Sequence, residues 1–418
     1  MDSLLDGIFA TVMIALVETF GIAAAVALGV PALPLALLSS LPVWVGTMIQ
    51  LRLRSRVAGA CRKPLIVRAV RLQALSLVGL AATGWFPGSI APWLYVAGFV
   101  LHGASNAAVS HLWMSWFSDI CPAQVLGRHT AWRSSAFALV QLVVALTAGV
   151  LAARYQARAT PWHVFALVFS IAGAARLASS AFLSRQYEPA PEAVAPMRSA
   201  FTPSSALRRF SVAIALLQGA AVMAGPFFAV WFLRDLRFSY WIFAAVGAAT
   251  LVGNLLCARV VGQLADRYGA ARVLSTSAVL AATVPFPYLV VESPGSVAAA
   301  NFYSGAAWAG VNVSAFKYLI GASRGDPTRS GIVYANVWLT SSVLLFSIAG
   351  GVLATRLPVL FEWRLQTLFA LSGIIRILIA LLLFPTLTEV EVTERTRRGG
   401  PGRFFQLFRW KGPGTSQT

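Results

Sequence analysis

The chain has 418 residues, of which 58% are hydrophobic and 11% are charged, and its mean hydropathy is +0.73. Soluble domains carry roughly 25% charged residues, so this composition excludes a soluble protein and indicates an integral membrane protein. A net charge of +19 would suggest nucleic-acid binding in a soluble protein. In a membrane protein, basic loops on one side of the bilayer account for it, so we expect no nucleic-acid partner.

Long apolar runs separated by short polar segments predict membrane-crossing helices, because a spanning helix needs about 20 apolar residues. The sequence predicts about twelve transmembrane helices. No basic residues precede the first run and no small-residue cleavage site follows it, so we interpret it as a span and not as a signal peptide. Pro285 and Pro287 predict a kink in the ninth. The twelve centres lie near residues 16, 43, 76, 105, 143, 172, 220, 249, 283, 308, 342 and 375.

A polar, proline-rich stretch at residues 185–209 interrupts the apolar pattern in the middle of the chain. We interpret it as a cytoplasmic linker between six spans in residues 1–184 and six spans in residues 210–386. Residues 387–418 are basic and rich in glycine and proline, and we expect a cytoplasmic tail there. The predicted fold class is therefore an all-α membrane protein built from two six-helix bundles.

Basic residues gather in the loops on one side of the predicted membrane, and in the linker and the tail. Because cytoplasmic loops carry an excess of Lys and Arg, we expect both termini to be cytoplasmic in a multi-pass protein of the inner or plasma membrane. The opposite side carries only Arg154, Arg158, Arg234, Arg237, Arg356 and Arg364.

The two halves of the sequence repeat each other. The pattern F-x-x-x-G-x-x-R begins at Phe169 in the sixth run and again at Phe369 in the twelfth, where it ends at Arg176 and Arg376. Internal duplication of this kind is typical of secondary transporters. Both arginines lie toward the inner ends of their spans, and we expect their side chains to reach the headgroups.

The loop between the eighth and ninth runs carries a polar motif. Its sequence reads G-Q-L-A-D-R-Y-G-A-A-R, and its characteristic residues are Gly262, Asp266, Arg267, Gly269 and Arg272. Glycine permits the turn conformations, and Asp266 can cap the next helix or pair with an arginine. The motif resembles the loop signature G-x-L-A-D-R-x-G-x-x-R of the major facilitator superfamily, and the chain is similar to a bacterial branch of that family.

The first half carries weaker copies of these gate-side features. Alignment of Arg62 with Arg272 places Arg56 where Asp266 stands in the second half. The resemblance also extends over W-x-x-W-x-x-D-x-x-P, which contains Asp119, and we add Asp119 and Arg128 to the gate-loop candidates.

The resemblance implies how such a chain works. Two pseudo-symmetric six-helix bundles would rock around a midplane cavity lined by the first, fourth, seventh and tenth helices. Asp266 would pair with an arginine in one state of the gate. We expect a monomer in the lipid bilayer that binds a small-molecule substrate.

Glu18 lies near the middle of the first span. A carboxylate at that depth is costly and normally faces a cavity or a partner. A carboxyl group shielded from water there can exchange protons near neutral pH. It therefore predicts proton coupling or recognition of a cationic group, and the alternative is a hydrogen-bonded tie to a neighbouring helix.

Further polar side chains lie at similar depths in the helices that the resemblance assigns to the cavity. They can bind substrate or protons, or they can form hydrogen bonds between helices, and both interpretations stay open. These candidates are His102 and Asn106 in the fourth run, Gln218 in the seventh, and Asn301, Ser304, Trp308 and Asn312 in the tenth.

The sequence contains no phosphate-binding loop and no His/Cys cluster with metal-ligand spacing. We therefore expect no enzyme, no cofactor and no metal site, and transport driven by ions or by the solute gradient. The function predicted from the sequence is a proton-coupled secondary transporter of a cationic or neutral solute. The alternatives are an uncoupled facilitator and a non-transporting receptor or scaffold on the same fold.

Overall fold

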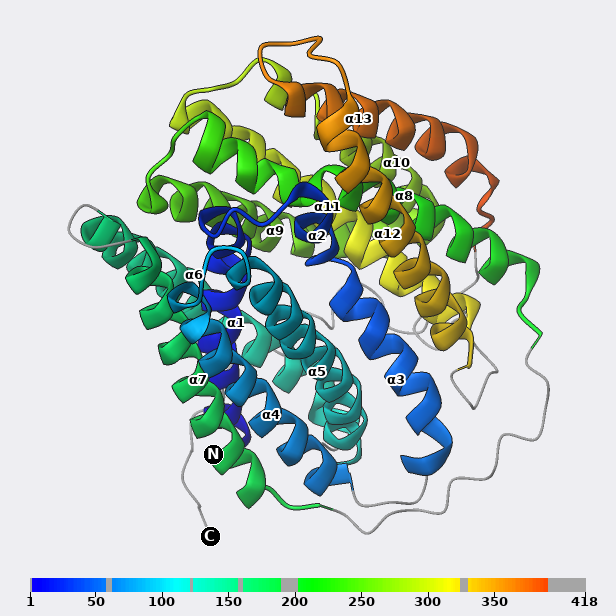
Figure 1. Cartoon of the computed structure of the whole chain (residues 1–418). Helices are drawn as coiled ribbons and strands as arrows, with labels where there is room; N and C mark the ends of the chain where they lie inside the picture. The colour runs from blue at the N-terminus through cyan, green and yellow to red at the C-terminus, as the bar shows by residue number, and fades with distance from the viewer. Residues whose placement is uncertain are drawn as a thin grey trace, which may run out of the picture.

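The computed structural model describes residues 2–57, 62–120, 123–156, 161–188, 202–323 and 330–389. The described residues contain α-helices and short helical turns and no strand, which confirms the predicted all-α class. Figure 1 shows the helices packed side by side in two groups that follow each other along the chain.

The first group holds seven helices. They are α1 (Asp2–Ala27), α2 (Ala32–Leu37), α3 (Leu41–Val57), α4 (Arg62–Ala82), α5 (Ala91–Ile120), α6 (Ala123–Gln156) and α7 (Pro161–Arg185). The second group holds six. They are α8 (Ser205–Val230), α9 (Tyr240–Tyr268), α10 (Ala270–Thr283), α11 (Pro294–Ala322), α12 (Ser330–Arg356) and α13 (Arg364–Leu382).

Every predicted span centre falls within one of these helices. Eight helical segments among the described residues are long and apolar enough to cross a membrane, which supports the predicted multi-pass protein. The number of twelve spans stays a prediction. The expected kink in the ninth span is instead a helix end, because α10 stops at Thr283, just before the two prolines.

The packing of the helices repeats between the two groups. In the first group α7 packs against α1 and α4, and α5 packs against α3 and α4. In the second group α13 packs against α8 and α10, and α11 packs against α9 and α10. The order of contacts is the same, as the sequence repeat predicts. The boundary at 185–209 stays a prediction, since residues 189–201 lie outside the described chain.

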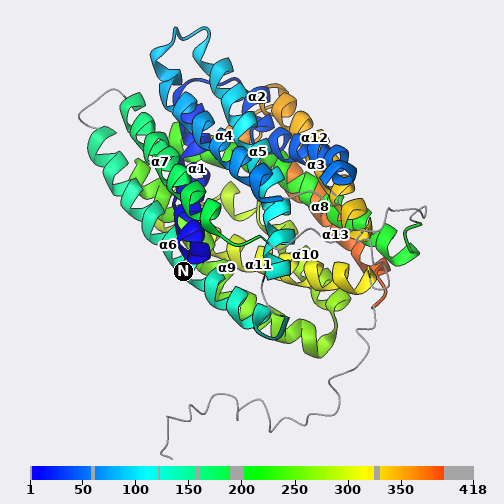
Figure 2. The same cartoon turned by 90° about the horizontal axis from the view of Figure 1, so that it is seen from below.

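Among the described residues, two larger interfaces join the groups, beside smaller contacts of α1 and α2 with α8. α6 packs against α9, and α2 and α3 pack against α12, as Figures 1 and 2 both show. Within the second group, α9 and α11 approach closely because Gly253 of α9 packs against the backbone of α11 and Gly305 of α11 packs against the backbone of α9. A Cβ atom at Gly305 would collide with the carbonyl oxygen of Thr250, and one at Gly253 with that of Phe302. This close approach fixes the position of α11 beside α9.

Arg376 is buried in the second group and does not reach the headgroups, so that expectation was wrong. Its side chain is 2% exposed and donates hydrogen bonds to the carbonyl oxygens of Ala221 (3.1 Å) and Ala281 (3.5 Å). Pro285 follows Ala281 by four residues and has no N–H, so the Ala281 carbonyl lacks its usual helical donor. The guanidinium replaces that donor inside the membrane.

We expect Arg376→Met to lower the thermal stability of the purified protein in detergent. The substitution leaves the buried carbonyl group of Ala281 without a donor, which costs about 1–3 kcal/mol, and it also removes the hydrogen bond to the Ala221 carbonyl. The matched control is Arg154→Met, which removes an exposed arginine at the end of α6. Equal melting temperatures for the two variants would contradict the proposed role of Arg376.

Candidate functional site

Several described contacts between the two groups of helices involve the end of the molecule where α9 begins. Ser347 of α12 donates a hydrogen bond to the carbonyl oxygen of Ala36 in α2 (2.6 Å). The rings of Phe20 and Tyr240 lie 6.5 Å apart between centroids, and Gly149 of α6 packs on Ala244 of α9. Tyr240 and Ala244 lie at the start of α9, whereas the gate motif lies at its end. Among the described residues, α6 and α1 therefore touch α9 at the end opposite the gate motif.

Glu18 is exposed although it lies in the middle of α1. Its Oε2 atom accepts a hydrogen bond from the Nε2 atom of Gln141 in α6, at 2.8 Å. α1 packs against α6 and α7 and also contacts α5 and α8. Its carboxylate is thus held in place by a neutral amide from the neighbouring helix.

His102 lies on a different side of the first group. It is buried beside the backbone of Gln73 in α4 and lies 6.3 Å from the ring of Phe99 between centroids. Asn106 is half-buried one turn further along α5. The structure therefore brings Glu18 to Gln141 and His102 to Gln73, and no described contact joins Glu18 to His102.

The candidate residues of α11 divide into two sets. Asn301 accepts a hydrogen bond from the hydroxyl of Thr250 (2.9 Å) and donates one to the carbonyl oxygen of Val297 (3.1 Å), so both ends of its amide bind protein groups. This arrangement is the interhelical alternative left open by the sequence. The other three keep some exposure: Ser304 and Trp308 are half-buried and Asn312 is exposed.

Gln218 of α8 is likewise half-buried, and the described hydrogen bonds include none from its side chain. Gln218 and the three partly accessible residues of α11 stay candidates for contact with a substrate.

A buried polar network ties the first group together, and the sequence analysis missed most of it. Arg176 is 5% exposed and donates to the Oε1 atom of Gln73 (2.6 Å) and to the hydroxyl of Ser179 (3.1 Å). Ser179 in turn donates to Asp6 of α1 (2.7 Å). Arg176 therefore does not reach the headgroups, contrary to expectation. A buried arginine normally pairs with a carboxylate. A search for the partner of Arg176 could therefore have identified Asp6 from the sequence.

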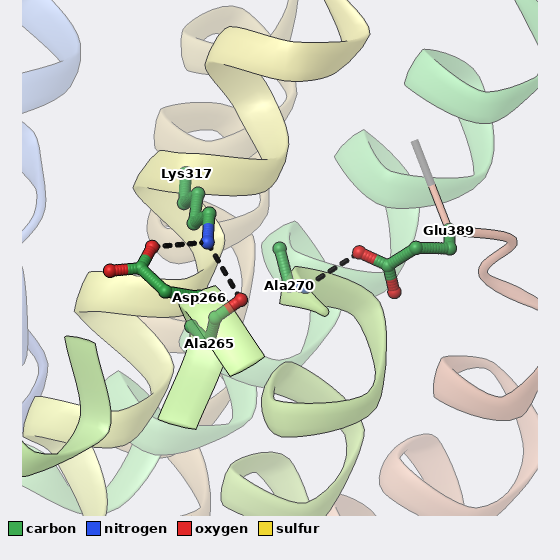
Figure 3. Close-up of polar contacts among 5 residues, drawn as sticks. All are labelled: Ala265, Asp266, Ala270, Lys317 and Glu389. Atoms are coloured by element: carbon green, nitrogen blue, oxygen red, sulfur yellow. Dashed lines mark hydrogen bonds and ion pairs between the residues drawn. The ribbon is translucent and has the colours of Figure 1, made fainter. Parts of the chain in front are cut away.

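In the gate motif Asp266 pairs with a lysine in this state. The Nζ atom of Lys317 donates to the Oδ1 atom of Asp266 and to the carbonyl oxygen of Ala265, both at 2.6 Å (Figure 3). Lys317 belongs to α11, which the glycine contacts hold beside α9. It meets the carboxyl-terminal end of α9, where the helix dipole favours a cation. The arginine pairing expected in another state stays a prediction.

Gly269 joins α9 to α10 and has a φ of 96°, in the region that favours glycine. A Cβ atom there would collide with the carboxylate of Glu389. That carboxylate accepts hydrogen bonds from the backbone N–H groups of Ala270 (2.6 Å) and Ala271 (3.0 Å), as Figure 3 shows for Ala270. Glu389 therefore caps α10, and Asp266 does not take the capping role that was one of its two alternatives.

The first group has the same kind of cap. Glu188, which follows α7, accepts hydrogen bonds from the backbone N–H groups of Arg62 and Lys63 at the start of α4. The caps therefore align Arg62 with Ala270 and correct the alignment of Arg62 with Arg272.

The other gate-loop candidates contribute less. Arg267 stacks on the ring of Tyr268 at 5.2 Å, Arg272 is exposed, and Gly262 has open space around it. The side chains of Arg56, Asp119 and Arg128 lie outside what the structure describes. Among the described residues no group of three His, Cys, Asp or Glu side chains could hold a metal ion.

Comparison with known proteins supports a transport fold. The family model of the Major Facilitator Superfamily matches residues 1–335. A bacterial homologue of the iron transporter ferroportin, in an inward-facing state, has a TM-score of 0.68 at 13% identity, covering 92% of this chain and 97% of that chain. A D-xylose-proton symporter has a TM-score of 0.68 at 16% identity, with 93% and 96% covered.

The nucleoside transporter NupG has a TM-score of 0.66 at 12% identity, with 92% of this chain and 98% of that chain covered. At these identities the structures are evidence of a shared fold and not of a shared substrate. A search among curated proteins found no match.

We expect Asp266→Asn to shift the balance between gate states by no more than about fivefold. The Asp266 side chain is 77% exposed, and exposed ion pairs contribute about 0–1 kcal/mol. Lys317→Gln removes the same pair and also the hydrogen bond to the Ala265 carbonyl, so it should shift the balance at least as far. Double electron–electron resonance between spin labels at the gate end measures the shift for each variant. A shift in the Asp266 variant alone would mean that the carboxylate acts through a partner other than Lys317.

Proposed function

The chain belongs to the major facilitator superfamily, and on that premise we propose that it is a secondary transporter that couples a small solute to protons by alternating access. The observation that carries the proposal is the Glu18–Gln141 hydrogen bond, which holds a carboxylate in the middle of α1. A protonatable group at that depth is costly, and such residues commonly belong to proton or substrate pathways.

Alternating access is supported by where the two groups touch. Ser347 and Ala36, and Gly149 and Ala244, join the groups at the end away from the gate motif. At the gate motif, Asp266 pairs with Lys317 within its own group. We propose that this is the inward-facing state, with both termini and the gate motif cytoplasmic. In the outward-facing state, the contacts of Ser347 with Ala36 and of Gly149 with Ala244 would break, and the loops at the gate end would come together.

Proton coupling follows from the chemistry of the Glu18 pair. When Glu18 is ionised, its carboxylate accepts a hydrogen bond from the amide N–H of Gln141. When Glu18 is protonated, its hydroxyl can donate to the amide oxygen of a rotated Gln141. The amide can thus hold the side chain in both protonation states. The D-xylose-proton symporter, which shares the fold, is proton-coupled by name.

The solute class is proposed from the charge of the candidate residues. Gln218, Ser304, Trp308 and Asn312 are neutral, and Glu18 adds one carboxylate. Among the described residues no base pairs with Glu18, and such an acid favours a cationic or neutral solute over an anion. An uncoupled facilitator would use the same neutral residues without a proton cycle on Glu18. A non-transporting receptor or scaffold on the fold would move neither solute nor protons.

We expect Glu18→Gln to abolish gradient-driven accumulation while it preserves exchange of solute across the membrane. The amide keeps the shape and hydrogen-bonding capacity of the acid but cannot release a proton. Proteoliposomes with an internal pH-sensitive dye, screened with neutral and cationic solutes, identify a substrate by its proton flux. Accumulation and exchange of that substrate are then measured on the wild type and on the variant.

The matched variant Glu18→Ala separates the alternatives. If Glu18 only ties α1 to α6, Glu18→Gln transports normally and Glu18→Ala lowers the melting temperature. If Glu18 binds a cationic solute without carrying protons, Glu18→Gln raises the apparent KM and impairs exchange as well. Full pH-driven accumulation by Glu18→Gln would remove the coupling role.

A further inference from the structure

The outer face of α4 carries an unusual pair of arginines. α4 packs against α5 and α7, and Figures 1 and 2 show it at the outside of the first group of helices. Its exposed side chains recur every three or four residues and so form one stripe along the helix. From the start of the helix inward, the stripe includes Arg68, Arg71, Leu72, Leu75 and Val78.

The apolar part of this stripe is too short to cross a bilayer. Trp85 lies fourteen positions after Arg71, is exposed at the far end of the helix and suits the opposite interface. At 1.5 Å per residue this distance is about 21 Å, whereas the hydrocarbon core is about 30 Å thick. Arg71 therefore lies at a depth where its guanidinium must extend toward the headgroups to find an anion.

The second group of helices provides an internal comparison. The caps by Glu188 and Glu389 align Arg62 with Ala270, and the same shift aligns Arg68 with Thr276 and Arg71 with Val279. Thr276 and Val279 are also exposed, on the equivalent face of α10. The fold therefore places this face outward in both halves but does not require arginine there.

The protein offers these arginines no described carboxylate. Glu188, which caps the start of α4, already accepts hydrogen bonds from two backbone N–H groups there. Lys63 donates to the carbonyl oxygen of Gln186 (2.8 Å), and Arg185 stacks on Phe182 (5.6 Å). This part of the first group is thus basic, and among the described residues neither Arg68 nor Arg71 forms an ion pair.

We propose that Arg68 and Arg71 bind the phosphate group of an anionic phospholipid in the leaflet where α4 begins. Two guanidinium groups one helical turn apart can each donate paired hydrogen bonds to phosphate oxygens. The acyl chains of the lipid would lie along Leu72, Leu75 and Val78. Basic sites beside transmembrane helices bind anionic headgroups in this way.

The test uses the full-length protein in phosphatidylcholine nanodiscs that contain increasing amounts of phosphatidylglycerol. Native mass spectrometry counts the phosphatidylglycerol molecules that stay bound. The variant Arg68→Thr/Arg71→Val gives α4 the residues of α10. The matched control is Arg154→Thr/Arg356→Val, which removes two exposed arginines elsewhere. Melting curves in phosphatidylcholine alone establish that each variant is folded.

We expect the α4 variant to bind phosphatidylglycerol on the order of thirtyfold more weakly, because each basic residue contributes about fivefold in affinity. The control should stay within about twofold of the wild type. Equal binding by the α4 variant and the wild type would overturn the proposal, and so would an equal loss in both variants.

A second measurement does not depend on the double variant. Arg68→Gln and Arg71→Gln, made singly, should each weaken binding about fivefold. Soluble glycerol phosphate should not protect the wild type against thermal unfolding, because it lacks the acyl chains that contact the leucines. Protection equal to that by phosphatidylglycerol would contradict a lipid site.

Discussion

The structure depends on one constraint, which is that every polar group inside the hydrocarbon needs a partner within the protein. Arg376 illustrates it, since Pro285 leaves the carbonyl of Ala281 without a donor and the guanidinium fills that place. Arg176 illustrates it again, through Gln73, Ser179 and Asp6. These buried arginines connect helices that are distant in the sequence and so tie each group of helices together.

The internal repeat shows which features belong to the scaffold. Both halves cap an equivalent helix with a carboxylate, Glu188 on α4 and Glu389 on α10. Both halves bury an arginine at the same place in the repeat, but only the first supplies Asp6 as a charged neighbour. Features that occur in one half alone, such as Glu18 and the arginines of α4, are not required by the fold.

The Glu18–Gln141 pair suggests how protonation could act on the conformation. Gln141 belongs to α6, and α6 also carries Gly149, which packs on Ala244 of the other group. One helix therefore connects the proposed proton site with the contact that must break in the reverse state. Protonation of Glu18 can shift the balance between the two conformations only if the Glu18–Gln141 hydrogen bond differs in strength between them.

The sequence by itself determined the membrane class, the helix positions, the repeat and the family, because apolar run lengths and local motifs carry that information. It also identified Glu18, since an acid inside an apolar run is visible without a structure. The tertiary structure decided the partners. Gln141, Asp6 and Lys317 meet their targets across helix interfaces, and Asn301 proved to be tied to Thr250. Such pairings depend on how helices rotate and pack against each other, and spacing along one helix does not encode the face that a neighbouring helix presents.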